Sequence, residues 1–349
     1  MRNFNFQDEY PKLLTPDIVG CLCAIHEYKG RQDAILRGNE KNLDKMYDQS
    51  RFLSIKSSNR MQGITAGESQ LKKLAADKAN PHGEHEKKIA GYRDAWIKIY
   101  RKKDLLPYTA ETLSELHKDL YRWSWVPGAG SFRKANRFGP SGSAEMTGIQ
   151  QIFPFEEIPE AMNQLYETFI RLKDSGEDPL LFIPAAVLNF LIIRPFSVGN
   201  DRMSRLFMHL LLVQSGYYAG RYCSLEKRME ESCRIYSGII DSAAQDSAES
   251  GINYEPFTRY LLRIISETCG EFTERASIME SGELSKLGQV RETIRKAGGE
   301  FTKAEITGRC TNISEKTMQR AFEMLIASNE IIKIGGGRYT TYKWNGERN

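Results

Sequence analysis

Apolar residues recur at helical spacing along most of this chain of 349 residues. Such spacing is typical of amphipathic helices that bury one face. The pattern predicts helices at residues 16–36, 40–60, 85–100, 110–123, 158–173, 225–245 and 256–279. Residues 64–86 are polar, and a turn is predicted at Asn80-Pro81-His82-Gly83. We therefore expect a mainly α fold, and a chain of this length is enough for two or three domains.

The stretch from 184 to 193 differs from these helices because it is apolar nearly all round. It predicts a buried helix with Pro184 in the first turn. Arg194 precedes Pro195 and is pushed out of the helical region, so the helix is expected to end there. Gly199 allows a tight turn. A second helix is then predicted from about Arg202 to Gly216.

The start of that second helix is a candidate anion site. Its first turn exposes unpaired N–H groups at the positive end of the helix dipole, where phosphates bind readily. Arg202 and Arg205 are three positions apart and share one helix face. Guanidinium groups suit phosphate oxygens. An ordinary surface helix with two solvated arginines is the alternative.

The whole stretch from Arg194 to Arg205 resembles the signature loop of the Fic (Fido) family, His-x-Phe-x-Asp/Glu-Gly-Asn-Gly-Arg-x-x-Arg. Phe196, Gly199 and Asn200 match this pattern, as do both arginines. The candidate nucleotide- or anion-binding residues are Gly199, Asn200, Asp201, Arg202 and Arg205. Members of the family usually move AMP from ATP onto a hydroxyl of a target protein. The resemblance implies a Fic-type helical core at residues 106–280, with the signature loop at 194–205. It covers roughly residues 10–275, because 116–120, 127–133 and 152–154 also resemble segments of the family's core.

Residues 126–151 are rich in glycine, serine and basic side chains. The resemblance implies that they form a loop with a short β-hairpin, the family's flap over the active site. In the family this flap aligns the backbone of a target by strand addition, so a protein target could bind here. An idle loop is the alternative.

Three departures from the signature indicate that the chemistry is lost. Arg194 stands where the family has its histidine base, and a guanidinium has no lone pair to accept a proton. Val198 stands at the acidic position and cannot ligate Mg²⁺. Asp201 replaces the second glycine, and we expect it to be the N-cap of the helix. Its charge could also neutralise Arg194, Arg202 or Arg205, and a cap with no further role is the alternative. We therefore predict weak or no ATP binding, with ATP and Mg²⁺ as cofactors only if activity remains.

A second stretch, residues 58–63, resembles the family's inhibitory motif, Ser/Thr-x-x-x-Glu-Gly/Asn. Ser58 and Gly63 match, but Gln62 replaces the glutamate that pairs with the second signature arginine in active members. Gln62 could still hydrogen-bond to Arg205, without the strength of a charged pair. The motif would then have decayed together with the signature loop. An ordinary polar helix end is the alternative.

No other residue is an obvious base. His209 lies one turn beyond Arg205 and is expected to pack against a neighbouring helix, and His117 is expected to be structural. His26, His82 and His85 show no metal-ligand spacing, so we expect no metal site. The six cysteines are scattered and are expected to be reduced and mostly buried.

Residues 285–349 are expected to form a separate small α+β domain. Helices are predicted at 286–297, 303–309 and 314–328, the last with Ser314 as N-cap. Strands are predicted at 331–334 and 338–342, around Gly335-Gly336-Gly337. This order resembles a winged helix-turn-helix. The segment holds twelve Lys/Arg and seven Asp/Glu, a net charge of +5, against +4 for the whole chain.

Such a domain could bind nucleic acid. Its candidate contacts are Lys316, Thr317, Gln319 and Arg320, on the exposed side of the helix predicted at 314–328. Arg338, on the wing formed by the two predicted strands, is a further candidate. A winged helix used for protein contacts is the alternative.

The remaining expectations concern location and function. The chain has no apolar run near the roughly 20 residues of a membrane span and no signal-peptide core at its start, so we expect no membrane association and a cytoplasmic location. Residues 1–105 are expected to be an N-terminal helical region. The sequence favours a catalytically degenerate regulator that binds DNA or a protein partner. An active protein adenylyltransferase with an unusual base, and a binding module for another anion, are the alternatives.

Overall fold

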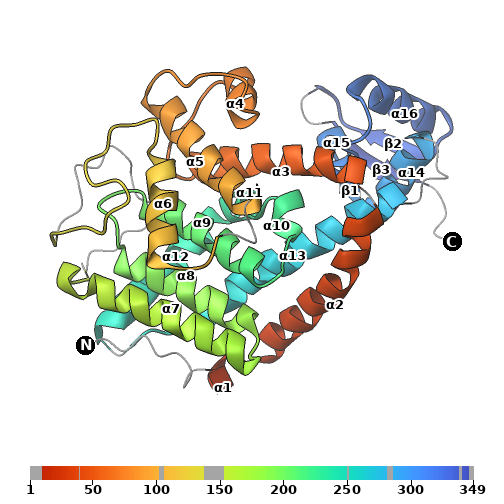
Figure 1. The fold of residues 1–349 in the computed structure, drawn as a ribbon. Coiled ribbons are helices and arrows are strands. Elements are labelled where there is room, and N and C mark those ends of the chain that lie inside the picture. Colours follow the sequence, from red (N-terminus) through yellow and green to blue (C-terminus); the bar gives the residue numbers. More distant parts are fainter. Residues whose placement is uncertain are drawn as a thin grey trace. The chain divides into compact units, whose positions relative to one another are not determined.

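The computed structural model describes residues 10–38, 40–101, 106–136, 153–249, 251–280, 286–337 and 340–345. Contacts divide the chain into two compact units. Unit 1 comprises residues 1–29 and 50–269, and unit 2 comprises residues 30–49 and 270–349. The domain boundaries expected from the sequence stay a prediction. The described elements are mainly helices with one three-stranded antiparallel sheet, so the expected mainly α class is confirmed (Figure 1).

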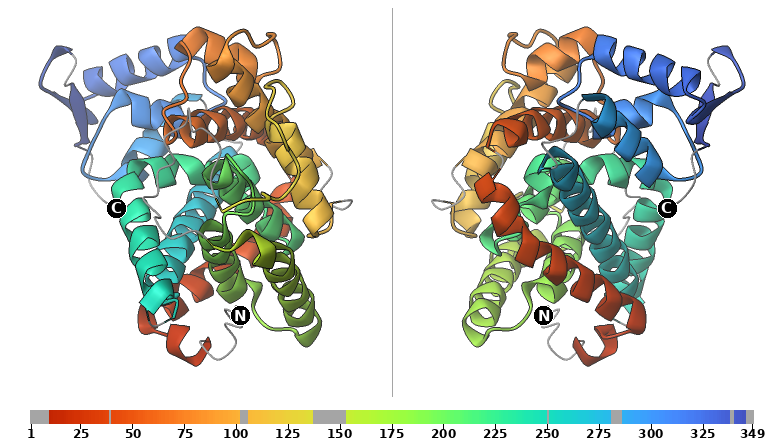
Figure 2. Two further views of the ribbon diagram at one scale, coloured as in Figure 1. Left: turned by 90° about the vertical axis from the view of Figure 1, so that its left-hand side faces the viewer. Right: turned by 90° about the vertical axis from the view of Figure 1, so that its right-hand side faces the viewer.

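The described elements of unit 1 are all helices, joined by turns and loops. Three long helices have residues in both units: α2 (Pro16–Gly38), α3 (Glu40–Arg60) and α13 (Glu255–Glu280). The others in unit 1 are α1 (Tyr10–Leu13), α4 (Glu68–Ala75), α5 (Glu84–Arg101), α6 (Ala110–Leu120), η2 (Phe155–Glu157), α7 (Ile158–Ser175), α8 (Pro179–Ile193), α9 (Asn200–Gln214), α10 (Ala219–Tyr222), α11 (Leu225–Glu231) and α12 (Cys233–Glu249). α8 packs on α7 and α9, and α5 packs on α6 and α9 (Figures 1 and 2).

The helix α8 forms the centre of the unit 1 core. All of its residues from Leu180 to Ile193 are buried, and each large apolar side chain buried in this way contributes about 1.5–3 kcal/mol. The prediction of a buried helix is confirmed, but its start was placed too late. Asp178 caps the helix through a hydrogen bond from the Leu180 amide, 3.0 Å long, and Pro179 occupies the first turn. Pro184 lies inside the helix.

Other boundaries also differ from the prediction. The polar stretch 64–86 contains a helix that was not expected, α4. This helix is stable because it buries Leu71, Leu74 and Ala75 on one face. The single helix predicted at 225–245 is two helices, α11 and α12. Ser232 separates them, and its hydroxyl donates to the Arg228 carbonyl at 2.8 Å.

Gly91 allows α5 and α6 to lie close together, because a Cβ there would be 2.1 Å from the Leu120 oxygen.

Unit 2 contains α14 (Lys286–Ala297), β1 (Glu300–Phe301), α15 (Lys303–Arg309), α16 (Glu315–Ala327), β2 (Ile331–Ile334) and β3 (Thr341–Trp344). The sheet order is β1-β3-β2, and Phe301 pairs with Tyr342. Strand β1 was not expected, and the second hairpin strand was placed too early, at 338–342. The Ser314 cap of α16 is confirmed by its hydrogen bond from the Thr317 amide. Thr302 and Glu305 form a capping box at the start of α15.

The core of unit 2 lies between these helices and the sheet. It includes Met318, Phe322 and Leu325 on the inner face of α16. The rings of Phe322 and Tyr342 meet edge to face at 4.9 Å, an arrangement that stabilises aromatic pairs. Among the described residues, no helix combines the length and apolar character that crossing a membrane requires.

Candidate functional site

The loop between α8 and α9 carries the signature-like residues, and two left-handed residues shape it. Arg194 ends α8 with φ of 48° and ψ of 66°, and Gly199 precedes α9 with φ of 77°. Position 199 requires glycine because of this left-handed φ. It also requires glycine because a Cβ there would lie 2.4 Å from the Tyr121 hydroxyl oxygen. A side-chain-bearing residue at 199 would be strained and would also clash.

Asn200 closes this loop on itself. Its amide nitrogen donates to the Phe196 carbonyl at 2.9 Å, and its amide oxygen accepts from the Phe196 N–H at 3.0 Å. Both residues are fully buried. Asn200 was expected as an anion-binding residue, and the structure shows that its amide is engaged in holding the loop.

The structure places Asp201 differently from the sequence expectation. Gly199 is the N-cap of α9, without a side-chain cap, so Asp201 is the second residue of the helix and not its cap. Asp201 is 2% exposed and Arg194 is 4% exposed. Burial lowers the pKa of Arg194, and the charge of Asp201 acts in the opposite direction. A carboxylate therefore already lies in the first turn of α9, where a bound phosphate would be favoured.

Arg133 holds the other side of the loop. Its guanidinium donates to the carbonyls of Arg194 at 3.0 Å and Ile193 at 3.3 Å, and its main-chain N–H donates to the Pro195 carbonyl at 2.8 Å. These bonds satisfy carbonyls at the end of α8 that have no partner within the helix. The sequence reasoning did not single out Arg133, because nothing local links position 133 to position 194.

Arg202 and Arg205 are both buried and contact α3. Arg205 donates from Nε to the Ser58 hydroxyl at 2.7 Å and from Nη2 to the Ser58 carbonyl at 3.0 Å. Arg202 donates to the Asn59 side chain at 3.4 Å and to the Lys88 carbonyl at 3.1 Å. Neither guanidinium lies within 4.0 Å of a carboxylate in the described part of the chain.

Ser58, and not Gln62, is therefore the partner of Arg205. The hydrogen bond considered between Gln62 and Arg205 is not formed. Gln62 Nε2 and Arg205 Nη1 are both buried without a hydrogen-bond partner among the described residues. Gly63, with φ of 66°, follows in the turn after α3. The structure thus brings the motif-like segment 58–63 next to the signature-like loop, with the contact made four residues earlier than expected.

His117 supports the loop from α6. Its ring stacks on Phe196 with centroids 4.0 Å apart and 6° between the planes. Nδ1 accepts a hydrogen bond from the Gly130 N–H at 2.8 Å, so Nε2 carries the proton and donates to the Val198 carbonyl at 3.1 Å. Burial, together with the nearby Arg202 charge, lowers the pKa of His117 to about 4 against an ordinary 6.5, although the bond to Val198 opposes this. His117 is therefore neutral near pH 7.

His209 is packed within unit 1, as expected. Its Nδ1 lies 2.6 Å from the Tyr100 hydroxyl and its Nε2 lies 2.8 Å from Glu226 Oε1. Tyr92 also donates to Glu226 Oε1 at 2.9 Å. Burial would raise the pKa of Glu226, but the His209 charge and the hydrogen bonds outweigh it and lower that pKa. This closed polar network leaves neither nitrogen of His209 available to accept a proton from a substrate.

The candidate nucleic-acid contacts lie on α16 in unit 2. Lys316, Gln319 and Arg320 are exposed and Thr317 is half-buried. Thr317 hydrogen-bonds to Ser314, and Gln319 bonds both Lys303 and Glu323. Arg338 and most of the expected flap, at 137–152, lie outside the described residues.

No metal centre emerges from the described residues, in which no group of three or more His, Cys, Asp or Glu could hold an ion. All six cysteines are free, and Cys223, Cys269 and Cys310 are buried. Cys21 and Cys233 are half-buried and Cys23 is exposed, so half of the cysteines are buried, and not most of them as expected.

Comparisons with known proteins give a family match for part of the chain and a similar fold over more of it. Residues 107–212 match the model of the Fic/DOC family. A solved Fic family protein from Desulfovibrio desulfuricans is similar in structure, with a TM-score of 0.61 and 18% identity, over 96% of this chain and 98% of that one. No curated protein of similar sequence was found.

Two further solved structures are similar over less of this chain. A Fic-domain-containing signalling protein from Bacteroides thetaiotaomicron gives a TM-score of 0.59 and 17% identity, over 73% of this chain and 98% of that one. Fic-1 from C. elegans, residues 134–508 with E274G, gives a TM-score of 0.58 and 16% identity, over 75% and 73%. At these identities the similarity establishes the fold alone.

Proposed function

We propose that this chain, which contains a Fic/DOC domain, does not transfer AMP and acts instead as a regulator whose unit 2 binds DNA. The observation that carries the first part is the buried Arg194 at the position of the family's base, beside the charge of Asp201. A guanidinium remains protonated near neutral pH even when burial lowers its pKa, and it cannot take a proton from a target hydroxyl.

The surrounding residues do not fit ATP with Mg²⁺. Val198 has no side-chain oxygen for a hard cation. Asp201 places a negative charge in the helix turn where phosphate would bind, and Asn200 is engaged with Phe196. Arg205 is engaged by Ser58. We infer that the loop keeps the shape of a nucleotide site, while its polar groups form hydrogen bonds to other groups of the protein.

The buried histidines His117 and His209 offer no substitute base. Both ring nitrogens of His117 and of His209 are engaged in hydrogen bonds inside unit 1. A working transferase with an unusual base remains the competing function. It would require a proton acceptor that the described loop does not provide.

The transfer assay tests this part of the proposal directly. Purified protein is incubated with ATP labelled on the α-phosphate and Mg²⁺ or Mn²⁺, and we expect no label on the chain or on added cell protein. The triple variant Arg194→His, Val198→Asp, Asp201→Gly should bind ATP in calorimetry, and adding Arg205→Ala should abolish that binding. Label transferred by the wild-type chain would refute the proposal and favour the unusual-base alternative.

The second part of the proposal is that residues 285–349, which lie within unit 2, form a winged helix-turn-helix. Their element order, α14-β1-α15-α16-β2-β3, and the sheet order β1-β3-β2 support it. On this reading α16 is the recognition helix. The exposed Lys316 and Arg320 have no ion pair within the described residues, whereas Arg291, Arg295 and Lys296 are paired with acids. Cations without acidic partners are the ones available to phosphates.

The salt dependence of DNA binding tests this part. Random duplex DNA is titrated at two salt concentrations with wild type, with Lys316→Ala/Arg320→Ala, and with the charge-matched control Arg295→Ala/Lys296→Ala on α14. The α16 variant should lose affinity, and its log–log salt slope should be shallower by about 2, one for each lost phosphate contact. The control should keep the wild-type slope. No DNA binding, or equal effects of the two variants, would favour protein contacts for unit 2.

A further inference from the structure

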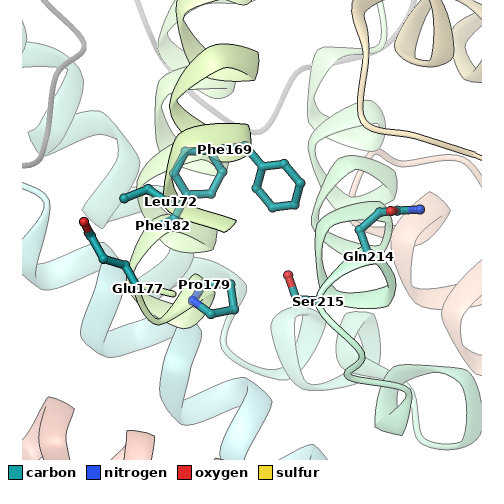
Figure 3. Close-up of a pocket in the computed structure, with 7 residues that line it drawn as sticks. All are labelled: Phe169, Leu172, Glu177, Pro179, Phe182, Gln214 and Ser215. Atoms are coloured by element: carbon teal, nitrogen blue, oxygen red, sulfur yellow. The ribbon is translucent and has the colours of Figure 1, made fainter. Parts of the chain in front are cut away.

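The far end of α9 borders a small cavity. About 200 Å³ of space is lined by residues of α7, α8 and α9 and of the segments beside them, namely Phe169, Leu172, Glu177, Pro179, Phe182, Gln214 and Ser215 (Figure 3). Gln214 is the last residue of α9 and Ser215 follows it. At 1.5 Å per residue, roughly 20 Å of helix separates this cavity from Asn200. The cavity is therefore distinct from the signature-like loop.

The floor of the cavity is apolar. Phe182 is fully buried, Leu172 is 2% exposed and Phe169 is 5% exposed. The two phenylalanine rings lie with centroids 5.4 Å apart and 43° between their planes. A water molecule in such a site finds few of the polar partners that hold it in place. An apolar group can displace water of this kind with a gain in affinity.

Ser215 supplies the polar contact. Its hydroxyl points toward the aromatic rings, whereas the carboxylate of Glu177 and the amide of Gln214 point away from them (Figure 3). Gln214 Nε2 donates to the Leu106 carbonyl. The Ser215 hydroxyl makes no hydrogen bond within the part of the chain that the structure describes. One hydroxyl that can both donate and accept thus faces an apolar floor.

We propose that this cavity binds a neutral molecule with one aromatic ring and one hydroxyl or N–H group, which hydrogen-bonds to Ser215. The size supports a single ring, since an apolar cavity of about 150 Å³ holds benzene and this one is about 200 Å³. The lining supports a neutral ligand, because burying an unpaired charge against Phe169 and Phe182 is strongly unfavourable. The hydroxyl of Ser215 selects a ring that carries one hydrogen-bonding group.

Two ring compounds of the same shape test this inference. p-Cresol carries a hydroxyl and toluene does not, and both are titrated into the full chain by calorimetry and ligand-observed NMR. Wild type should bind p-cresol about tenfold more tightly than toluene, the factor that a net hydrogen bond of about 1.4 kcal/mol gives. Ser215→Ala should reduce this ratio to nearly one while toluene binding stays unchanged.

Bulk at the same position provides a second variant. Ser215→Phe fills the cavity and should abolish binding of both compounds. Ser277→Phe on α13, where the serine is exposed and bonds only the Glu274 carbonyl, is the matched control and should bind as wild type does. Absence of saturable binding to wild type, or an unchanged ratio in Ser215→Ala, would overturn the proposal. Equal binding by a folded Ser215→Phe variant would do the same. None of these results depends on AMP transfer or DNA binding.

Discussion

Protonation of His117 should loosen the loop between α8 and α9 as the pH falls. In the folded chain the pKa of His117 is about 4, against 6.5 for an unhindered histidine. Between pH 6.5 and 4, His117 is therefore protonated in the unfolded chain but neutral in the folded chain. The stability that neutral His117 provides is complete above pH 6.5. It is lost progressively as the pH falls from 6.5 toward 4. At 1.36 kcal/mol per pKa unit, the loss between pH 7.5 and 4.5 is about 2.5 kcal/mol.

The structural reason lies in the two hydrogen bonds of the ring. A proton on Nδ1 would abolish the acceptor for the Gly130 N–H and would place a charge among buried groups. The free energy of unfolding is measured by urea titration at constant ionic strength, with tryptophan fluorescence, to which the fully buried Trp96 of unit 1 contributes. His117→Gln removes the titration, so its stability should fall by about 2.5 kcal/mol less than that of wild type over this pH range. The control His85→Gln, at an exposed histidine, should follow wild type. Parallel curves for wild type and His117→Gln would refute the reasoning.

Three further substitutions test the loop, each by urea or thermal unfolding. Gly199→Ala should destabilise unit 1 by about 2 kcal/mol or more, because it places a side chain at a left-handed position and in a clash with Tyr121. The control Gly63→Ala, at a left-handed position in open space, should lose less stability. Equal losses in the two variants would contradict the role of the clash. Arg133→Ala should lower stability by roughly 3 kcal/mol through the loss of bonds to buried carbonyls at 193 and 194, with Arg122→Ala, at an exposed arginine on the turn after α6, as the neutral comparison. Asp201→Asn should cost about 3 kcal/mol because it removes the charge that opposes buried Arg194, and a stability equal to wild type would show that this charge is screened.

Local pattern determined the helices around the site. The uninterrupted apolar run before Arg194 specified a buried helix wherever it begins, and the glycine and arginines after it specified a turn followed by a helix. The three departures at Arg194, Val198 and Asp201 were also legible from the sequence, because the chemical capacity of a side chain is a property of its residue type. Boundaries were less certain. The cap Asp178 and the start of α8 were missed because Pro184 gave an equally good local signal for a first turn.

The assignment of partners depended on the tertiary structure. Ser58 and Arg205 are 147 residues apart, and no periodicity of the sequence says that Ser58, and not Gln62, meets the guanidinium. Arg133 at the end of α8 and His117 against Phe196 are contacts of the same kind. Asp201 is the second residue of α9, and not its cap, because the helix is capped at Gly199. Only glycine fits at that position, where a Cβ would clash with the Tyr121 hydroxyl. Side-chain spacing within one helix follows from backbone geometry and can be read along the chain, whereas contacts between distant segments form only when packing has brought them together.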